Sequence, residues 1–247
     1  MCDAHNKIKI ISYNIWFEDF NKTERLYSLL ERIDQEKPDV LCLQEVTEYD
    51  YEIIKKELSY EFRYPEKIDT RYGCVILSKY PMEKSITISL PSKMKRDLIL
   101  SKININDFIC VIANVHFESE FNNSNNIKKL QFKYVGAILN KLYCKYFNVV
   151  LCSDTNVTQY DEKQFSNCFY NFNDAWKING SDSKTQFTYD YDTNSNLQLR
   201  NIKLKCRIDR ILYKTNNFVC KSFGLLTGEN LFIDPSDHHG ISAVFIY

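Results

Sequence analysis

The sequence predicts an α/β fold in which two packed sheets carry helices on their outer faces. Short apolar runs recur along the chain, and two long stretches have apolar residues at helical spacing. Strands and helices alternate at first, a run of strands follows, then a helix with a strand, and then further strands. This order suits two packed sheets, not an uninterrupted parallel βαβ array. Because no Pro/Gly/Ser linker divides the 247 residues, we expect one domain over 1–247.

The first elements are two strands with a helix between them. The near-continuous apolar runs Lys7–Ile15 and Val40–Val46 are typical of strands covered on both faces. The helix is predicted over Thr23–Glu36, with Thr23 as its N-cap, and Pro38 ends it. Its apolar positions share one helical face: Leu26, Leu29, Leu30 and Ile33.

The rest of the chain is mainly strands around one long helix. Four consecutive strands are predicted at Cys74–Ser78, Ser85–Leu90, Leu98–Ile105 and Phe108–His116. The second helix is predicted over Ile127–Tyr146, with a buried stripe made of Ile127, Leu130, Tyr134, Ile138 and Leu142. The last strands are predicted at Phe147–Ser153, Lys205–Leu212, Phe218–Leu226 and Ile241–Ile246.

Charge and composition exclude several classes of protein. With 32 basic and 32 acidic residues the net charge is +0, so nucleic acid would have to bind in a local basic groove. No apolar run approaches the ~20 residues of a membrane span, and the first ten residues show no signal peptide. Nine cysteines without C-x-x-C pairs indicate reduced thiols. We therefore expect a nuclear or cytoplasmic protein that is neither secreted nor bound to membranes.

Polar side chains recur where apolar runs end. They are Asn14, Glu45, His116, Asp154, Asn156, Asp209, Asp237 and His238. Taken singly, each has an ordinary structural explanation, such as a cap, a turn, an ion pair or a hydrogen-bonded core histidine. Taken together they supply carboxylates, amides and imidazoles at matching positions, which favours a reaction site at one rim of the sheets.

This set of side chains suits the cleavage of a phosphodiester. Glu45 is the best single ligand for Mg²⁺, which is typically held by one or two carboxylates. Asp154 and Asn156 are expected to orient the attacking water. Hydrogen-bond donors are needed to stabilise the negative charge that builds on the phosphate oxygens, and the candidates are His116, His238 and Asn14. Asp209 would keep His238 protonated and oriented.

The motifs around these residues resemble the endonuclease/exonuclease/phosphatase superfamily. S-Y-N near the start, L-Q-E, a strand ending in His, D-x-N, R-x-D-R-I and S-D-H carry the resemblance from about residue 8 to the end. It implies a DNase-I-like, four-layered α/β sandwich and a Mg²⁺-dependent hydrolase for which Mn²⁺ can substitute. The resemblance places Asn14, Glu45, Asp154, Asn156 and His238 at catalytic positions, and we add Asp237 as a second metal carboxylate.

Further motifs resemble a subgroup that hydrolyses 5′-tyrosyl bonds to DNA. They are D-T-N at 154–156, H-F-E-S at 116–119, F-T-Y-D at 187–190 and N-S-N-L at 194–197. The resemblance implies a DNA 5′ end linked to a tyrosine of a protein or peptide, such as a trapped topoisomerase, with tyrosyl-RNA as a related substrate. We expect a monomer. It also implies His116 and Ser119 near the scissile phosphate and a groove lined by Trp176, Leu197, Leu199 and either Arg71 or Tyr72.

One departure and two alternatives accompany this interpretation. The Arg that follows D-T-N-x in the subgroup is missing, since the chain reads N-V-T-Q at 156–159. Another superfamily activity is the closest alternative: abasic-site endonuclease, deadenylase, sphingomyelinase or inositol phosphatase. A binding module derived from an inactive enzyme is the other, and the intact set of catalytic residues argues against it.

Overall fold

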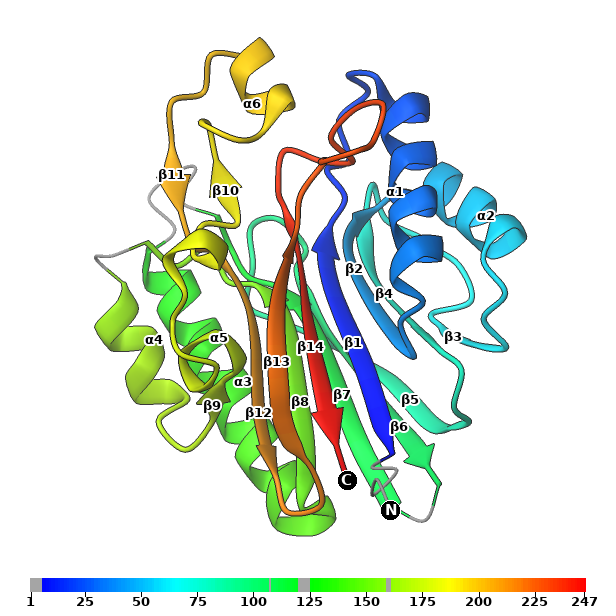
Figure 1. Cartoon of the computed structure of the whole chain (residues 1–247). Coiled ribbons are helices and arrows are strands. Elements are labelled where there is room, and N and C mark those ends of the chain that lie inside the picture. Colours follow the sequence, from blue (N-terminus) through cyan, green and yellow to red (C-terminus); the bar gives the residue numbers. More distant parts are fainter. Residues whose placement is uncertain (1–5, 107, 120–124, 159–160) are drawn as a thin grey trace.

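Two parallel strand pairs, each joined by a helix, form the centre of the fold. The computed structural model describes residues 6–106, 108–119, 125–158 and 161–247 (Figure 1). In the first pair, β1 (Lys7–Asn14) lies parallel to β2 (Val40–Val46), and α1 (Lys22–Glu36) connects them. In the second, β7 (Phe108–His116) lies parallel to β8 (Asn148–Asp154), and α3 (Asn125–Tyr146) connects them. Parallel pairs need such crossovers, and they bring their carboxyl ends to the same edge.

Each parallel pair is extended by antiparallel strands into a six-stranded sheet. The first sheet has the order β13 (Val219–Leu226), β14 (Gly240–Ile246), β1, β2, β4 (Gly73–Ser78), β3 (Phe62–Tyr64). The second has the order β5 (Met82–Ser89), β6 (Asp97–Ile105), β7, β8, β12 (Asp209–Thr215), β9 (Asn173–Asp174). A separate small hairpin consists of β10 (Tyr189–Asp190) and β11 (Lys205–Cys206).

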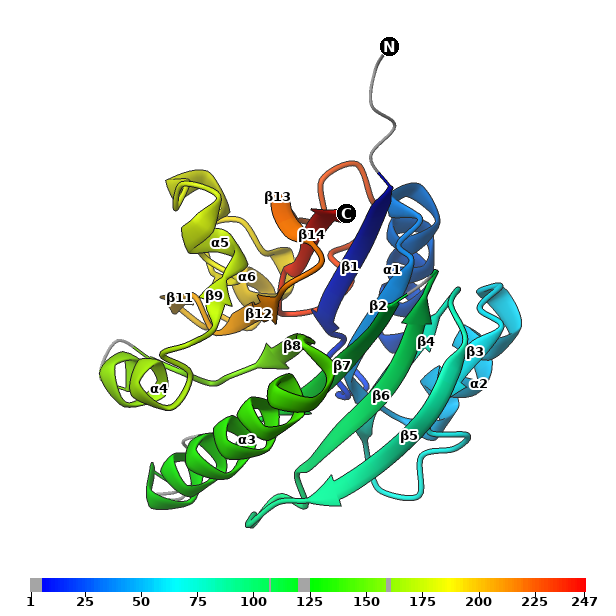
Figure 2. The same cartoon turned by 90° about the horizontal axis from the view of Figure 1, so that it is seen from below.

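Helices cover the outer faces of both sheets. Figure 2 shows α1 and α2 (Glu48–Glu57) outside the first sheet, and α3 and α4 (Glu162–Cys168) outside the second. Shorter helical turns lie in the connections after β9: α5 (Ala175–Ile178), a 3₁₀ turn (Ser183–Thr185) and α6 (Ser195–Leu199). These layers are the predicted four-layered α/β sandwich, and they confirm the fold class. No helix in the described ranges is both long enough and apolar enough to cross a bilayer.

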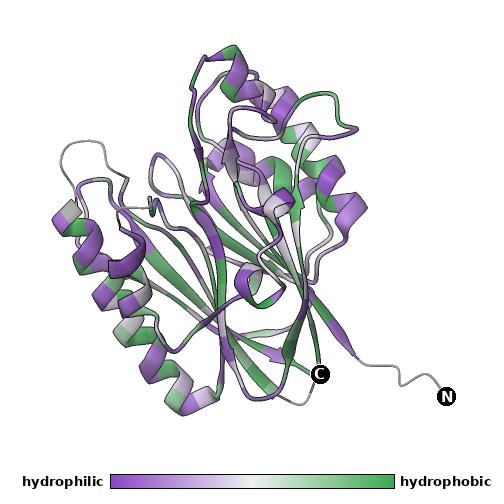
Figure 3. Ribbon diagram, turned by 60° about the vertical axis from the view of Figure 1, so that its left-hand side comes forward, coloured by the Kyte–Doolittle hydropathy of each residue, from purple (hydrophilic) through white to green (hydrophobic). Residues whose placement is uncertain are grey.

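The strand sequences explain the layering because successive side chains face opposite sides of a strand. On β1, Ile8 and Ile10 point between the two sheets, whereas Ile11 and Tyr13 pack beneath α1. All four are buried. Figure 3 shows the resulting apolar strands between helices of mixed polarity. Burial on both faces is what the near-continuous apolar runs predicted.

Both long helices differ in detail from the predictions. Thr23 is not the N-cap of α1, because the helix begins at Lys22 and Asn21 caps it in a left-handed conformation. The predicted stripe of α3 is also wrong in part, since Leu130 and Tyr134 are about half exposed. The buried apolar positions of α3 are instead Phe132, Val135 and Leu139. Apolar residues occur around much of this helix, so periodicity alone did not determine which face is buried.

The predicted strand Lys205–Leu212 is in fact two strands that belong to different sheets. β11 pairs with β10, whereas β12 pairs with β8. The chain changes sheets at Ile208, where the hydroxyl of Thr188 accepts the backbone N–H groups of Ile208 and Asp209. This break places Asp209 at the beginning of β12, opposite Asp154.

Candidate active site

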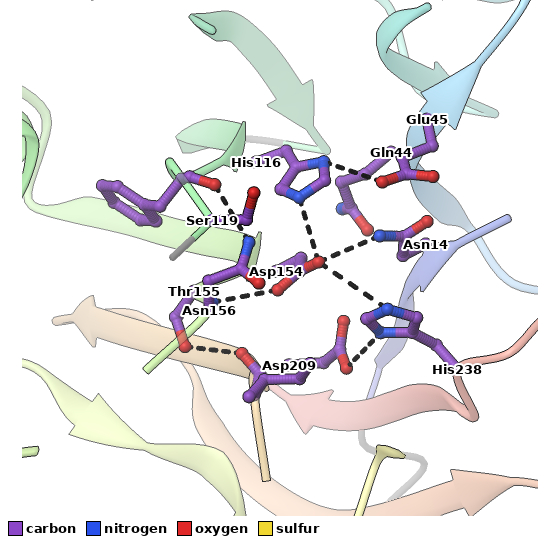
Figure 4. A network of polar contacts seen from close by, with 12 residues as sticks. Asn14, Gln44, Glu45, His116, Ser119, Asp154, Thr155, Asn156, Asp209 and His238 are labelled. Carbon is purple, nitrogen blue, oxygen red and sulfur yellow. Dashed lines mark hydrogen bonds and ion pairs between the residues drawn. The ribbon is translucent and has the colours of Figure 1, made fainter. Parts of the chain in front are cut away.

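The carboxyl ends of the two parallel strand pairs meet at one edge of the molecule, and the site is built there. Asn14 ends β1, Glu45 lies one residue before the end of β2, and His116 and Asp154 end β7 and β8. The parallel register pairs His116 with Asp154 directly. Figure 4 shows these side chains pointing toward one another.

Asp154 is the centre of the network. Its Oδ2 accepts a hydrogen bond from Asn14 Nδ2 at 2.9 Å, and its Oδ1 accepts one from the backbone N–H of Asn156 at 3.0 Å. The Asn156 side chain donates to Phe117 O, which fixes the turn after β8. Burial and the nearby charge of Asp209 raise the pKa of Asp154 to about 6, although His238 and the donated hydrogen bonds oppose the rise. An aspartate with this pKa is a stronger base than an ordinary one.

His238 is held as an imidazolium by Asp209. Its Nδ1 lies 3.0 Å from Asp209 Oδ2, and its Nε2 lies 3.9 Å from Asp154 Oδ2. Burial alone would lower the pKa of His238, but Asp209, with Asp154 and Asp237, raises it well above the ordinary value. The ring therefore carries a positive charge whose free nitrogen faces Asp154, as the sequence predicted for the Asp209–His238 pair.

His116 has the opposite charge state. Arg96 Nη1 lies 2.9 Å from His116 Nδ1, and because a guanidinium can only donate, this nitrogen must accept. The proton is then on Nε2, which lies 3.2 Å from Asp154 Oδ2. Burial and the charges of Arg96 and His238 lower the pKa of His116 well below its ordinary value. His116 is therefore a neutral group, and both of its ring nitrogens already face protein atoms.

Glu45 is a mostly buried carboxylate, and the charges of His238 and Arg96 only partly offset the effect of burial on its pKa. Its Oε2 accepts the backbone N–H of Phe17 at 3.1 Å. Its Oε1 lies 3.6 Å from Nδ1 of the neutral His116, which is too far for a hydrogen bond. Burial raises the pKa of Glu45, and burial also raises the pKa of Asp237, the second predicted metal carboxylate, to about 6. Glu45 is among the acids that contribute to the shift at Asp237.

This pair of carboxylates fits a divalent cation. The charge of Glu45 raises the pKa of Asp237, and a positive ion beside the two carboxylates would relieve that repulsion. Carboxylate oxygens are also the ligands that Mg²⁺ prefers. Ligand atoms of Asp154, Asp209 and His238 also lie within 4.8 Å of one another. We infer that these three residues take part in the reaction and do not bind the ion, because an imidazolium has no free lone pair for a metal.

The backbone at this edge adopts unusual conformations. The backbone φ values of Trp16, Glu45 and Asn156 are 60°, 60° and 47°. They lie in the left-handed region, which residues other than glycine rarely adopt. At Glu45 the left-handed residue coincides with a break in the pairing of β2 with β4, between Leu43 and Val46. Such bulges redirect side chains. The bulge thus turns the Glu45 carboxylate away from the regular face of the sheet.

The predicted substrate-binding residues fall into different environments. Tyr72 lines a small cavity together with Glu45, Arg96 and His116. Arg71 lies outside it, 4.6 Å from the ring of Phe17. Of the two residues proposed for one groove position, Tyr72 therefore faces the site.

The other predicted groove residues do not form one surface. Leu197 is completely buried, whereas Leu199, two positions along α6, is 67% exposed. Trp176 is the second residue of the separate helix α5, and its ring stacks on Arg207. Ser119 is buried close to His116 and Asn156 (Figure 4), and its hydroxyl donates to the sulfur of Met94. Leu197 is thus not available to line an open groove in this structure.

Sequence reasoning missed two residues that shape the site. Arg96 lies in the loop before β6, yet it is buried and binds His116. Phe17 binds Glu45 through its backbone and stacks on Tyr72. A backbone donor leaves no trace in the residue types, so only the position of Phe17 just after the S-Y-N motif could have indicated its role.

Comparison with known proteins identifies the family. The sequence model of the Endonuclease/Exonuclease/phosphatase family matches residues 11–238, and the chain belongs to this family. Among its relatives, tyrosyl-DNA phosphodiesterase 2 of Gallus gallus is 25% identical over 97% of this chain and 67% of the relative. The 5′-tyrosyl-DNA phosphodiesterase of Caenorhabditis briggsae is 28% identical over 97% of this chain and 69% of the relative. The chain thus spans about two thirds of the length of these relatives.

Solved structures agree with this placement. The crystal structure of truncated Caenorhabditis elegans TDP2 superposes with a TM-score of 0.86 at 25% identity and covers 98% of both chains. The human Nocturnin catalytic domain superposes with a TM-score of 0.74 at 21% identity over 98% of this chain and 95% of that one, which shows the shared fold alone. The predicted superfamily, and within it the likeness to the tyrosyl phosphodiesterases, is therefore confirmed.

Proposed function

We propose that this chain hydrolyses the 5′-phosphotyrosyl bond between a protein tyrosine and a DNA end, leaves a 5′-phosphate, and acts in DNA repair. The observation that carries the chemistry is the carboxylate of Asp154, held by Asn14 and by the Asn156 backbone beside the imidazolium of His238. The relatives named as tyrosyl-DNA phosphodiesterases support the choice of substrate, as does the superposition with the worm enzyme over 98% of both chains.

The ion that we propose is Mg²⁺, with Mn²⁺ as a substitute, held by Glu45 and Asp237. When bound, it would neutralise the charge on the phosphate oxygens. Asp154 would orient the attacking water in line with the leaving oxygen, with Asn14 and the Asn156 turn fixing the carboxylate. With a pKa of about 6, Asp154 is ionised at neutral pH and can also accept a proton from that water.

His238 is the group that would stabilise the developing charge on the phosphate. It is a fixed, buried cation whose charge Asp209 maintains, so no reorganisation is needed during the reaction. The tyrosine phenolate is a good leaving group because a phenol has a pKa of ~10, well below that of a sugar alcohol. A site with modest acid catalysis would therefore favour a tyrosyl bond over an internal phosphodiester.

The remaining parts of this proposal concern partners and compartment. We propose that the chain acts as a monomer on DNA ends that carry tyrosyl-linked proteins or peptides, and that tyrosyl-linked RNA is a second substrate. A nuclear or cytoplasmic location fits seven described cysteines that form no disulfide: Cys42, Cys74, Cys110, Cys144, Cys152, Cys168 and Cys220.

The direct test uses a 3′-labelled oligonucleotide with a 5′-phosphotyrosine and an internal abasic site. We expect Mg²⁺-dependent release of tyrosine and a product of full nucleotide length with a 5′-phosphate. The Asp154→Asn variant serves as the inactive control. Cleavage at the abasic site before the tyrosyl bond would assign the chain to the repair endonucleases, and full activity in excess EDTA would remove the metal from the proposal.

A further inference from the structure

A buried arginine of α1 binds the segment 15–20 that leads into its own helix. Arg25 is 1% exposed. Its Nη1 donates to Ile15 O and Trp16 O, its Nη2 to Trp16 O and Glu18 O, and its Nε to Phe20 O. Its guanidinium also lies 4.2 Å from the centre of the Trp16 ring. A guanidinium has five N–H donors. These five hydrogen bonds therefore use all of them on the backbone of one short segment.

This arrangement fixes a backbone that would otherwise be unfavourable. Trp16 has a φ of 60°, and a bulky residue adopts such a conformation only where its surroundings impose it. The carbonyl groups that Arg25 binds come from four different residues of the segment, so the guanidinium sets their relative orientation. Because this buried cation donates every N–H group to backbone oxygens, its main effect is to hold the segment 15–20 in one geometry.

The segment in turn contacts the site at two points through Phe17. The Phe17 N–H donates to Glu45 Oε2 at 3.1 Å. The Phe17 ring stacks on Tyr72, with ring centres 4.3 Å apart and planes 15° apart. Tyr72 faces Arg96, whose guanidinium carbon lies 5.4 Å from the centre of its ring, and Arg96 binds His116. One residue therefore orients the metal carboxylate by its backbone and the aromatic wall of the cavity by its side chain.

We propose that Arg25 is a positioning residue for the active site: by fixing the segment 15–20, it sets where Phe17 holds Glu45 and Tyr72. The inference rests on the proposed function for the role of Glu45 as metal ligand. Partners that orient metal ligands commonly contribute 10–100-fold to metal affinity, although they never touch the ion. Arg25 acts one step further out, and we expect the lower end of that range.

The test replaces Arg25 by lysine, which keeps the charge and reduces the donors from five to three. Arg32→Lys is the matched control, because Arg32 lies on the same helix and donates to the carbonyls of Thr227 and Glu229. Calorimetric titration of the substrate-free protein with Mn²⁺ measures metal affinity, and thermal unfolding in EDTA measures stability. We expect Arg25→Lys to weaken Mn²⁺ binding about tenfold and Arg32→Lys to change it less than twofold. This difference should hold however much each variant lowers the melting temperature.

A second pair of variants separates the two contacts of Phe17. Phe17→Ala keeps the backbone N–H and removes the ring, so Mn²⁺ affinity should stay close to that of the native protein. The KM for a 5′-phosphotyrosyl oligonucleotide should rise about three- to tenfold, as expected for the loss of one aromatic stack. Phe20→Ala, in the same segment but with an exposed ring, is the control. In the double variant with Arg25→Lys, the increases in KM should be less than multiplicative because both changes act on Tyr72.

The possible outcomes separate this inference from the proposed function. Unchanged Mn²⁺ affinity in Arg25→Lys, or an equal loss in Arg32→Lys, would overturn the positioning role while the proposed function stands. Mn²⁺ binding that responds as expected in a protein that leaves tyrosyl-DNA intact would overturn the substrate and leave the positioning role supported. A native protein that binds neither Mn²⁺ nor Mg²⁺ would overturn both.

Discussion

Asp154 and Asp209 are cross-strand partners at the end of the β8–β12 pair, yet their carboxylates have different neighbours. Asp154 accepts hydrogen bonds from the side chain of Asn14 and the backbone of Asn156, which are neutral donors. Asp209 instead binds the imidazolium of His238. Of these two neighbouring acids, Asp154 can accept a proton, whereas the charge of Asp209 is paired with His238. Such different roles for adjacent acids are typical of acid–base catalysis.

This division predicts unequal losses for the two isosteric variants. Asp154→Asn removes the group that orients the water and should lower the single-turnover rate by ~10³-fold or more, in the upper range for a catalytic base. Asp209→Asn acts only through His238 and should cost about 10²-fold. Single-turnover kinetics on tyrosyl-DNA at saturating Mg²⁺ measures both. Equal losses, with metal affinity unchanged, would contradict the assigned roles.

The pH dependence follows from the same groups. Asp154 has a pKa of about 6 and must be ionised, so kcat/KM should rise with pH and level off above about pH 6–7. His238 must stay protonated, and its raised pKa places the alkaline decline well above the value of a free imidazole. Asp209→Asn removes the charge that raises this pKa, so the alkaline decline should move to lower pH. An alkaline limb that stays in place would exclude His238 as its source.

Asp154→Asn should also stabilise the metal-free protein at neutral pH. The folded pKa of Asp154 lies above its usual 3.8, so its contribution to stability is fully present below pH 3.8 and is lost as the pH rises through about 6. Asparagine avoids that cost. Two pKa units correspond to about 3 kcal/mol, and 1 kcal/mol shifts the melting temperature by ~2–4 °C for a chain of this size. After a discount for weaker hydrogen bonds, we expect a gain of roughly 3–8 °C at pH 7.5 in EDTA, and less at pH 5.

Glu45→Gln tests the metal carboxylate. Loss of its charge should raise the Mg²⁺ concentration needed for half-maximal activity by at least ~10-fold, since one or two carboxylates typically hold this ion. Glu31→Gln, on the exposed face of α1, is a suitable control. Titration of activity with Mg²⁺ in both variants provides the measurement. A native-like requirement in Glu45→Gln would show that the ion lies elsewhere.

Binding to DNA should be only moderately sensitive to salt. The chain has a net charge of +0, and among the described residues the Lys and Arg side chains that line the cavity at the site are Lys95 and Arg96. We expect about three to five phosphate contacts and a slope of log K against log salt of roughly −2 to −4. Fluorescence anisotropy with a catalytically inactive variant measures this slope, and a value near −10 would indicate a much longer binding surface.

The sequence predicted the strands of both central pairs and the polar residues at their ends, because burial on both faces makes a strand apolar until it reaches the rim. Asn14, His116 and Asp154 are the last residues of their strands. The bulge that turns Glu45 is a property of strand pairing, and no local pattern indicates it.

The supporting residues could not be predicted because their roles depend on contacts between distant parts of the chain. Arg25 resembles any helical arginine until the preceding loop folds back onto it. Leu197 and Leu199 have equal hydrophobicity, yet α6 buries one and exposes the other. Residue type determines which chemistry is available, whereas packing determines which side chains can use it.

The pairing of β1 with β14 joins two distant parts of the chain at the site. β14 lies between β1 and β13 in the first sheet, and β1 ends at Asn14. His238 lies two residues before β14, so the pairing that completes this sheet also brings its imidazole beside Asp154 of the second sheet. We therefore expect any unfolding that separates β14 from β1 to remove the imidazolium from the site, so that activity and this strand pair are lost together.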